Sequence, residues 1–181
     1  RGGLAKYNWQ TKVLQEYKSE EFLGENITVL IKSQNGDILI GIDDTVYSLG
    51  EKSQIRKLFS LSEQMKLNNN EHQDPLFISG LVEDENRTLW ISTYKNYPRG
   101  SSRNRIGPLF KFKDKSVSKW QFGTEDKHNI GIYQIGTTQD GSLWLATTKG
   151  LIRLTKKGSY RRYTIKDGLL TNEVNSVHES L

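Results

Sequence analysis

Apolar residues occur along the chain in short runs separated by polar residues and turn signals, a pattern typical of half-buried β-strands. Three segments share the same order, in which an apolar run is followed by a turn and a second apolar run. The second run of each segment contains one of Leu39, Leu89 and Leu143, so the repeat is about 50 residues long. The chain is therefore predicted to be built from repeated β-hairpins.

Each predicted hairpin has its own turn signal. Asn35–Gly36 and Asp140–Gly141 supply residue types that adopt positive φ, as two-residue hairpin turns require. Asn86–Arg87 occupies the same place in the second repeat, where Arg meets a steric penalty that Gly does not. We expect two-residue turns at all three places.

Two further strand candidates follow each hairpin, and a similar pair opens the chain. They span residues 3–8 and 13–17, 45–49 and 55–59, 107–112 and 117–122, and 150–154 and 160–165. Four antiparallel strands recurring about every 50 residues are typical of a β-propeller blade. The alternative is a solenoid of hairpins, whose repeats are normally shorter.

The fold class expected is all-β, a β-propeller segment of four-stranded antiparallel blades. A single segment would span residues 1–181, with a partial blade at 1–25, blades at about 26–73, 74–128 and 129–170, and the start of a next blade at 171–181. Incomplete sheets leave strand edges bare. The segment is therefore expected either to continue in a longer chain, which we favour, or to pair with a second copy as a homodimer.

Composition narrows the function without defining it. The 181 residues fit one domain, and no apolar run approaches the roughly 20 residues of a membrane-spanning helix. The net charge of +5 is a modest excess that does not indicate nucleic-acid binding. The chain has no cysteine, which excludes disulfides, thiolate metal sites and cysteine nucleophiles.

Catalytic chemistry has little support in the sequence. His72, His128 and His178 lack the close spacing of paired metal ligands. The carboxylates of Glu83–Asp84 and Asp43–Asp44 are neighbours in sequence, and their side chains diverge in a strand. No nucleophile elbow, phosphate loop or calcium loop is present. We predict no catalytic residue, no metal site and no cofactor, and hence no enzyme.

The stretch 141–154, followed by 163–174, resembles the two-component regulator propeller repeat. The pattern of that repeat is roughly Asp-Gly-x-Leu-Trp-Ile-Gly-Thr, then Gly-Leu, then Tyr before Asp-Gly-Leu and Asn-x-Val. The third repeat of this chain matches nearly throughout, the second keeps Leu89–Thr93, and the first is degenerate. The resemblance therefore covers the chain with decreasing specificity towards its beginning.

This resemblance implies the ligand-sensing, signal-input region of a bacterial membrane-anchored regulator, located in the periplasm. The implied ligand is a small molecule or an oligosaccharide. The implied partners are the remaining propeller blades and a membrane-linked output domain of the parent chain, which would carry any kinase or cyclase activity. Alternatives are a protein-interaction scaffold and a polysaccharide lyase or glycosidase on a propeller scaffold. No nucleic-acid partner is expected.

Long links between strands are the candidate binding elements, because binding residues collect on loops held by a rigid scaffold. The link at 94–106 joins the second and third strands of its blade, and the link at 59–75 emerges on the same face. The ligand-binding candidates in the first link are Tyr94, Tyr97, Arg99, Arg103 and Arg105. They would suit an anionic or sugar-like ligand or a partner protein, whereas the competing interpretation is a solvated loop. Trp90 and Trp144 are expected to pack between neighbouring sheets.

Overall fold

The computed structural model describes residues 3–17, 27–50, 54–67, 75–95, 107–122 and 130–179. These residues form antiparallel sheets whose strands follow the order of the chain. The first sheet is a hairpin of β1 (Leu4–Asn8) and β2 (Val13–Tyr17), with Leu4 opposite Tyr17. It supplies the outer pair of strands predicted at the beginning of the chain.

Three four-stranded sheets follow, here called blades 1, 2 and 3. Blade 1 contains β3 (Ile27–Lys32), β4 (Ile38–Ile42), β5 (Thr45–Leu49) and β6 (Ile55–Ser60). Blade 2 contains β7 (Leu76–Glu83), β8 (Leu89–Lys95), β9 (Leu109–Lys113) and β10 (Ser116–Lys119). Blade 3 contains β11 (Ile132–Thr137), β12 (Leu143–Thr147), β13 (Gly150–Leu154) and β14 (Tyr160–Tyr163). The all-β prediction with four-stranded antiparallel blades is confirmed.

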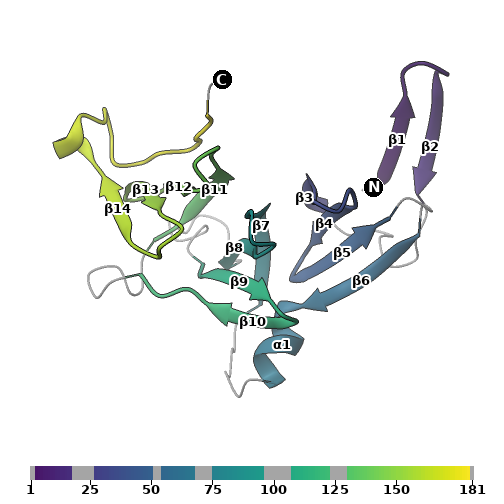
Figure 1. Ribbon diagram of the computed structural model, residues 1–181, viewed down its shortest axis with the longest axis horizontal. Helices are drawn as coiled ribbons and strands as arrows, with labels where there is room; N and C mark the ends of the chain where they lie inside the picture. Colours follow the sequence, from purple (N-terminus) through teal and green to yellow (C-terminus); the bar gives the residue numbers. More distant parts are fainter. Residues whose placement is uncertain are drawn as a thin grey trace.

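The blades fan out from their first strands. Figure 1 shows β3, β7 and β11 near the middle of the molecule and β6, β10 and β14 at its outside. The first strands of successive blades contact one another, β3 with β7 and β7 with β11. This radial order is that of a propeller, in which first strands line the central channel.

The core lies between the blades and not within any one sheet. At the junction of blades 1 and 2, Val46 packs in one cluster with Ile78, Ile91 and Phe110. At the junction of blades 2 and 3, a second cluster contains Leu109 and the buried side chains of blade 3. Both faces of a middle strand are therefore buried, which explains why β4 is wholly apolar and why the first five residues of β8 are all buried.

The hairpin turns differ from the two-residue turns expected. In blade 1 the N–H of Ser33 donates to the oxygen of Asp37, and Gly36 donates to Ser33, which leaves a three-residue loop. Blades 2 and 3 have the same bonds, and Gly36, Arg87 and Gly141 all have positive φ. Such a loop is a type I turn followed by one left-handed residue, so only one residue of each signal needs positive φ. The expectation of two-residue turns was wrong for this reason.

A short helix, α1 (Leu61–Leu67), follows blade 1 and was not predicted. Asp44, which lies in a different turn of the same blade, fixes its beginning. The Asp44 carboxylate accepts hydrogen bonds from Ser60 Oγ at 2.9 Å, from the Ser62 N–H at 3.2 Å and from Thr45 Oγ1 at 2.9 Å. The carboxylate thus satisfies an N–H that the first turn of a helix leaves unpaired.

We expect Asp44 to make the stability of the protein sensitive to acid. Burial alone would raise the pKa of its carboxyl, but hydrogen bonds from Ser62, Ser60 and Thr45 together outweigh burial and hold the pKa below its ordinary value. A depressed pKa in the folded state means that the carboxylate stabilises the fold above its unfolded-state pKa. That contribution is lost as the pH falls through the folded-state pKa.

Asp44→Asn should therefore lower the free energy of unfolding by about 1–3 kcal/mol near neutral pH. The difference from the wild type should shrink as the pH falls below about 4. Urea unfolding of the wild type and the variant, once near neutral pH and once below about pH 4, measures this difference. A difference that is the same at both would show that the charge of Asp44 contributes nothing.

Residues 171–179, predicted to start a next blade, form no strand. They nevertheless lie along blade 3 as a first strand would. The Val174 N–H donates to the Thr147 oxygen at 2.9 Å, and the Val177 N–H donates to Gln134 Oε1 at 3.0 Å. These hydrogen bonds run to the carbonyl oxygen of Thr147, at the end of β12, and to side chains. Residues 171–179 therefore do not make the regular backbone ladder that defines a strand.

Candidate functional site

The strand order gives every blade two different edges. The turn edge carries the hairpin turns 33–37, 84–88 and 138–142, together with the outer turns at 114–115 and 156–158. The loop edge carries the links from second to third strands and from each blade to the next. Any binding residue in the predicted link at 94–106 belongs to the loop edge.

Tyr94 is the only predicted binding residue that the described part of the chain contains. It lies near the end of β8, opposite Phe77 of β7, and the two rings stack with their centroids 5.4 Å apart. The other four candidates, Tyr97, Arg99, Arg103 and Arg105, lie outside the described residues. The structure therefore places one aromatic ring at the base of the link, and the binding role of all five residues stays a prediction.

The base of this link is tightly held. A Cβ added to Gly107 would lie 2.2 Å from the backbone oxygen of Thr93. Only glycine therefore fits at the place where the chain leaves the link and enters β9 beside β8. Thr93 Oγ1 also donates to the Pro108 oxygen at 2.7 Å. The link therefore starts and ends on adjacent, rigid backbone, which is the arrangement expected of a loop carried by a scaffold.

Trp90 has the packing role expected of it. Its side chain is 9% exposed, its indole N–H donates to Asp84 Oδ2 at 2.9 Å, and its ring meets Trp120 edge-on at 5.4 Å. Asp84 Oδ1 in turn accepts from the backbone N–H groups of Asn86 and Thr88, both at 2.9 Å. One carboxylate thus ties the turn of blade 2 to the tryptophan behind it.

Trp144 occupies the same place in blade 3 and is less buried. It stacks on Tyr163 at 5.8 Å, and the Arg153 guanidinium lies 5.7 Å from its ring centroid. Arg153 also pairs with Asp140. Hydrogen bonds from Thr138, Ser142 and Arg153 hold the pKa of Asp140 well below its ordinary range. No blade among the described residues covers this face of blade 3.

Few groups that could do chemistry come together. Within the ranges that the structure describes, no cluster of three His, Asp or Glu side chains could hold a metal ion. His178 is exposed, and His72 and His128 lie outside these ranges. The Glu83 carboxylate accepts from the Gln34 N–H of blade 1, whereas Asp84 serves its own turn. These two carboxylates therefore do not face a common reacting group.

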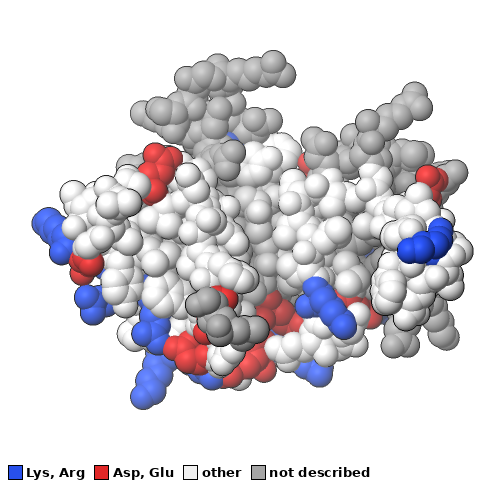
Figure 2. All heavy atoms as spheres, turned by 90° about the horizontal axis from the view of Figure 1, so that it is seen from above, with Lys and Arg blue, Asp and Glu red and all other residues white. Residues whose placement is uncertain are grey.

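Charge is unevenly distributed on the surface. In Figure 2, acidic and basic side chains lie close together along the lower edge of the view, and the described surface at the centre of the view is mostly uncharged. Among the described helices, none is long and apolar enough to cross a membrane.

No protein-family model and no curated protein matches the chain. Solved structures do match it. The extracellular domain of the hybrid two-component system BT4673 from B. thetaiotaomicron is 17% identical to this chain, and the two structures superpose with a TM-score of 0.66. The match covers 96% of this chain and 22% of that one. The extracellular domain of BT3049, a hybrid two-component system from the same organism, is 22% identical to this chain with a TM-score of 0.67. That match covers 93% of this chain and 21% of the BT3049 chain. Virginiamycin B lyase from Staphylococcus aureus is 13% identical with a TM-score of 0.60, over 88% and 47%.

These matches establish the class of fold. The chain is a β-propeller segment, and it shares its arrangement of blades with extracellular domains of two-component systems. That is the kind of protein to which the repeat resemblance pointed. The chain spans about a fifth of the length of these two domains.

Proposed function

We propose that the chain is part of the ligand-sensing, signal-input propeller of a bacterial membrane-anchored regulator. The observation that carries this proposal is the fold shared over nearly the whole chain with extracellular domains of two-component systems. The Leu-Trp-Ile-x-Thr type repeat of blades 2 and 3 agrees with it. A periplasmic location and a separate, membrane-linked output domain belong to the same proposal.

The ligand proposed is a saccharide or another small molecule bound at the loop edge. The link that starts at Tyr94 supplies aromatic rings for a sugar face and guanidinium groups for hydroxyl or acidic groups. Its rigid base at Thr93 and Gly107 supports a defined position for such residues. Binding would act on the output domain through a difference in affinity between two arrangements of the receptor, typically worth about 1–3 kcal/mol.

One observation favours a second candidate, an enzyme on a propeller scaffold. Virginiamycin B lyase shares the fold over 88% of the chain. A lyase needs a base placed beside the proton that it removes. Asp84 and Asp140 in the hairpin turns serve the scaffold, which makes the sensor the better supported of the two.

Substitution of three arginines in the link tests the sensor proposal. Arg99, Arg103 and Arg105 are replaced together by Ser, and binding of a panel of defined acidic and neutral oligosaccharides is measured by calorimetry. We expect the wild type to bind at least one of them. The variant should bind the same oligosaccharide with an affinity lower by about tenfold or more, and its melting temperature should equal that of the wild type. A control replaces Lys6, Lys12 and Lys166, exposed lysines far from the link in sequence, by Gln. Equal affinity of variant and wild type would remove the link from the binding site.

A further inference from the structure

Successive blades are clamped together at the turn edge by a repeated hydrogen bond. At the junction of blades 1 and 2, the backbone N–H of Gln34 donates to Glu83 Oε2 at 2.7 Å. At the outer side of blade 3, the N–H of Gln139 donates to Glu179 Oε2 at 2.9 Å. Gln34 and Gln139 hold the same turn position, because each directly follows the residue whose N–H closes its turn, Ser33 and Thr138. A carboxylate of the following segment closes both junctions.

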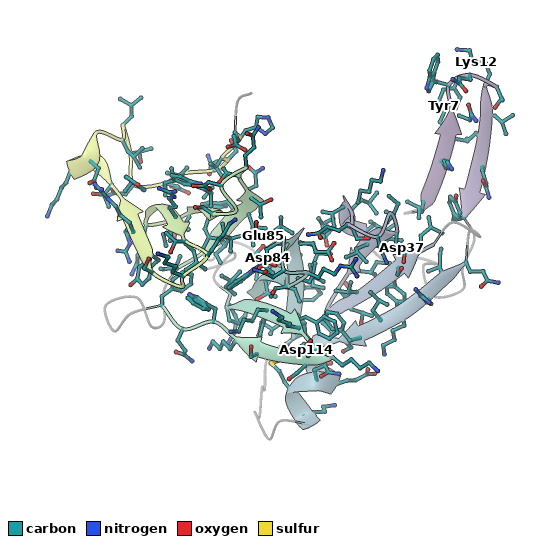
Figure 3. The ribbon with its side chains drawn as sticks, in the orientation of Figure 1. Tyr7, Lys12, Asp37, Asp84, Glu85 and Asp114 are labelled. Atoms are coloured by element: carbon teal, nitrogen blue, oxygen red, sulfur yellow. The ribbon has the colours of Figure 1, made fainter. Side chains whose placement is uncertain are left out.

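The junction of blades 2 and 3 lacks this clamp. In blade 2 the residue equivalent to Gln34 is Glu85. In blade 3 the residue equivalent to Glu83 is Thr137, at the end of β11, which has no carboxylate. Within the described residues, no hydrogen bond joins the Glu85 N–H to blade 3. A long side-chain bridge takes its place, in which Lys156 Nζ lies 2.5 Å from Glu85 Oε2. In Figure 3, Asp84 and Glu85 lie near the middle of the molecule, between blade 3 and blade 1.

A groove of about 380 Å³ opens at this junction. Its apolar wall includes Trp120, Leu143 and Leu154, and Lys111, Lys113 and Lys157 contribute to its polar wall. The volume falls in the range of small-molecule sites. The indole N–H of Trp120 is buried without an acceptor among the described residues.

The groove has an excess of positive charge. The Asp84 carboxylate is occupied by its own turn and Trp90, and Glu85 is paired with Lys156. In the part of the chain that the structure describes, the ammonium groups of Lys111, Lys113 and Lys157 have no carboxylate within ion-pair distance. Lys111 Nζ lies 5.6 Å from the centroid of the Trp120 ring, so cation and aromatic surface are adjacent.

We infer that this junction groove is a binding site for a small organic anion that carries several negative charges on a flat, partly apolar body. The three ammonium groups, which have no carboxylate partner among the described residues, would balance sulfate, sulfonate or carboxylate groups, and the indole and leucine side chains would cover a ring. The site lies on the turn edge, opposite the edge that carries the link at 94–106. It is therefore independent of the function proposed above and does not rest on it.

Calorimetry with naphthalenetrisulfonate as the probe tests the site in the whole chain. We expect saturable binding by the wild type that weakens with added salt, and no saturable binding of inorganic sulfate alone, which lacks the ring. Replacing Lys111, Lys113 and Lys157 together by Gln should weaken binding by about tenfold or more. The control removes the same charge from Lys6, Lys12 and Lys166, all exposed. Equal losses in the two triple variants, or no binding by the wild type, would overturn the inference.

A single substitution tests the site from the opposite direction. Thr137→Glu supplies the carboxylate that the other two junctions have, and it should close the groove and weaken probe binding about tenfold or more while the melting temperature is kept or raised. Thr137→Val has a similar side-chain volume and no carboxylate, so it should bind as the wild type does. Unchanged binding by a folded Thr137→Glu variant would show that the probe lies elsewhere. Loss of binding by both variants would also contradict the assignment.

Discussion

Phe110→Ala is expected to lower the free energy of unfolding by about 3–5 kcal/mol. Phe110 lies in β9 and is 1% exposed, and it belongs to the cluster that joins blades 1 and 2. Its removal leaves a cavity between two sheets that cannot close unless a blade moves. Urea unfolding followed by tryptophan fluorescence measures the loss.

Leu170→Ala is the control for this truncation, because Leu170 is fully exposed. It should change the free energy of unfolding by no more than about 0.5 kcal/mol. A small effect of Phe110→Ala would mean that blades 1 and 2 do not pack through this cluster.

Gly150→Ala should destabilise the fold by about 3 kcal/mol or more. Gly150 has a φ of +116°, which side chains disfavour, and a Cβ built there would lie 2.3 Å from the backbone oxygen of Tyr163. Gly150 and Tyr163 lie in the paired strands β13 and β14, so neither backbone can move away cheaply. The reduced stability should appear in thermal unfolding followed by circular dichroism.

Gly36→Ala separates the two causes of this effect. Gly36 also has a positive φ, of +93°, but no atom lies within 4 Å of the added Cβ. It should cost only the backbone strain, about 1 kcal/mol. If both substitutions had the same effect, the close approach at Gly150 would be absent in solution.

The blades could be predicted because their signals are local. Leu39, Leu89 and Leu143 mark the second strand of each blade, and a short apolar run that follows a turn signal can be recognised without knowledge of distant residues. The type of turn was predicted wrongly, because Asn35–Gly36 suits a two-residue turn and the left-handed place of a three-residue loop equally well. Only the bond from Ser33 to Asp37 distinguishes them.

Features that depend on distant partners could not be predicted. Helix α1 has seven residues, and its start is held by Asp44 from an earlier turn of the blade. The junction groove lies between blades 2 and 3, where Thr137 occupies the position that a carboxylate holds at the other two junctions. A signal existed in the sequence, since alignment of β7, β11 and the segment 171–179 places Glu83, Thr137 and Glu179 at the same position. Its meaning appears only when the blades are placed side by side.

The central claim is that the chain binds a ligand as a sensor and does not transform it. The most direct measurement follows the ligand and the protein in one nuclear magnetic resonance titration of the chain with any oligosaccharide that binds in the calorimetric panel. A sensor should give shifted protein signals, and the ligand signals should keep their chemical identity over a day of incubation. New ligand signals from a cleaved or eliminated product, lost on heat denaturation of the protein, would contradict the sensor and establish an enzyme.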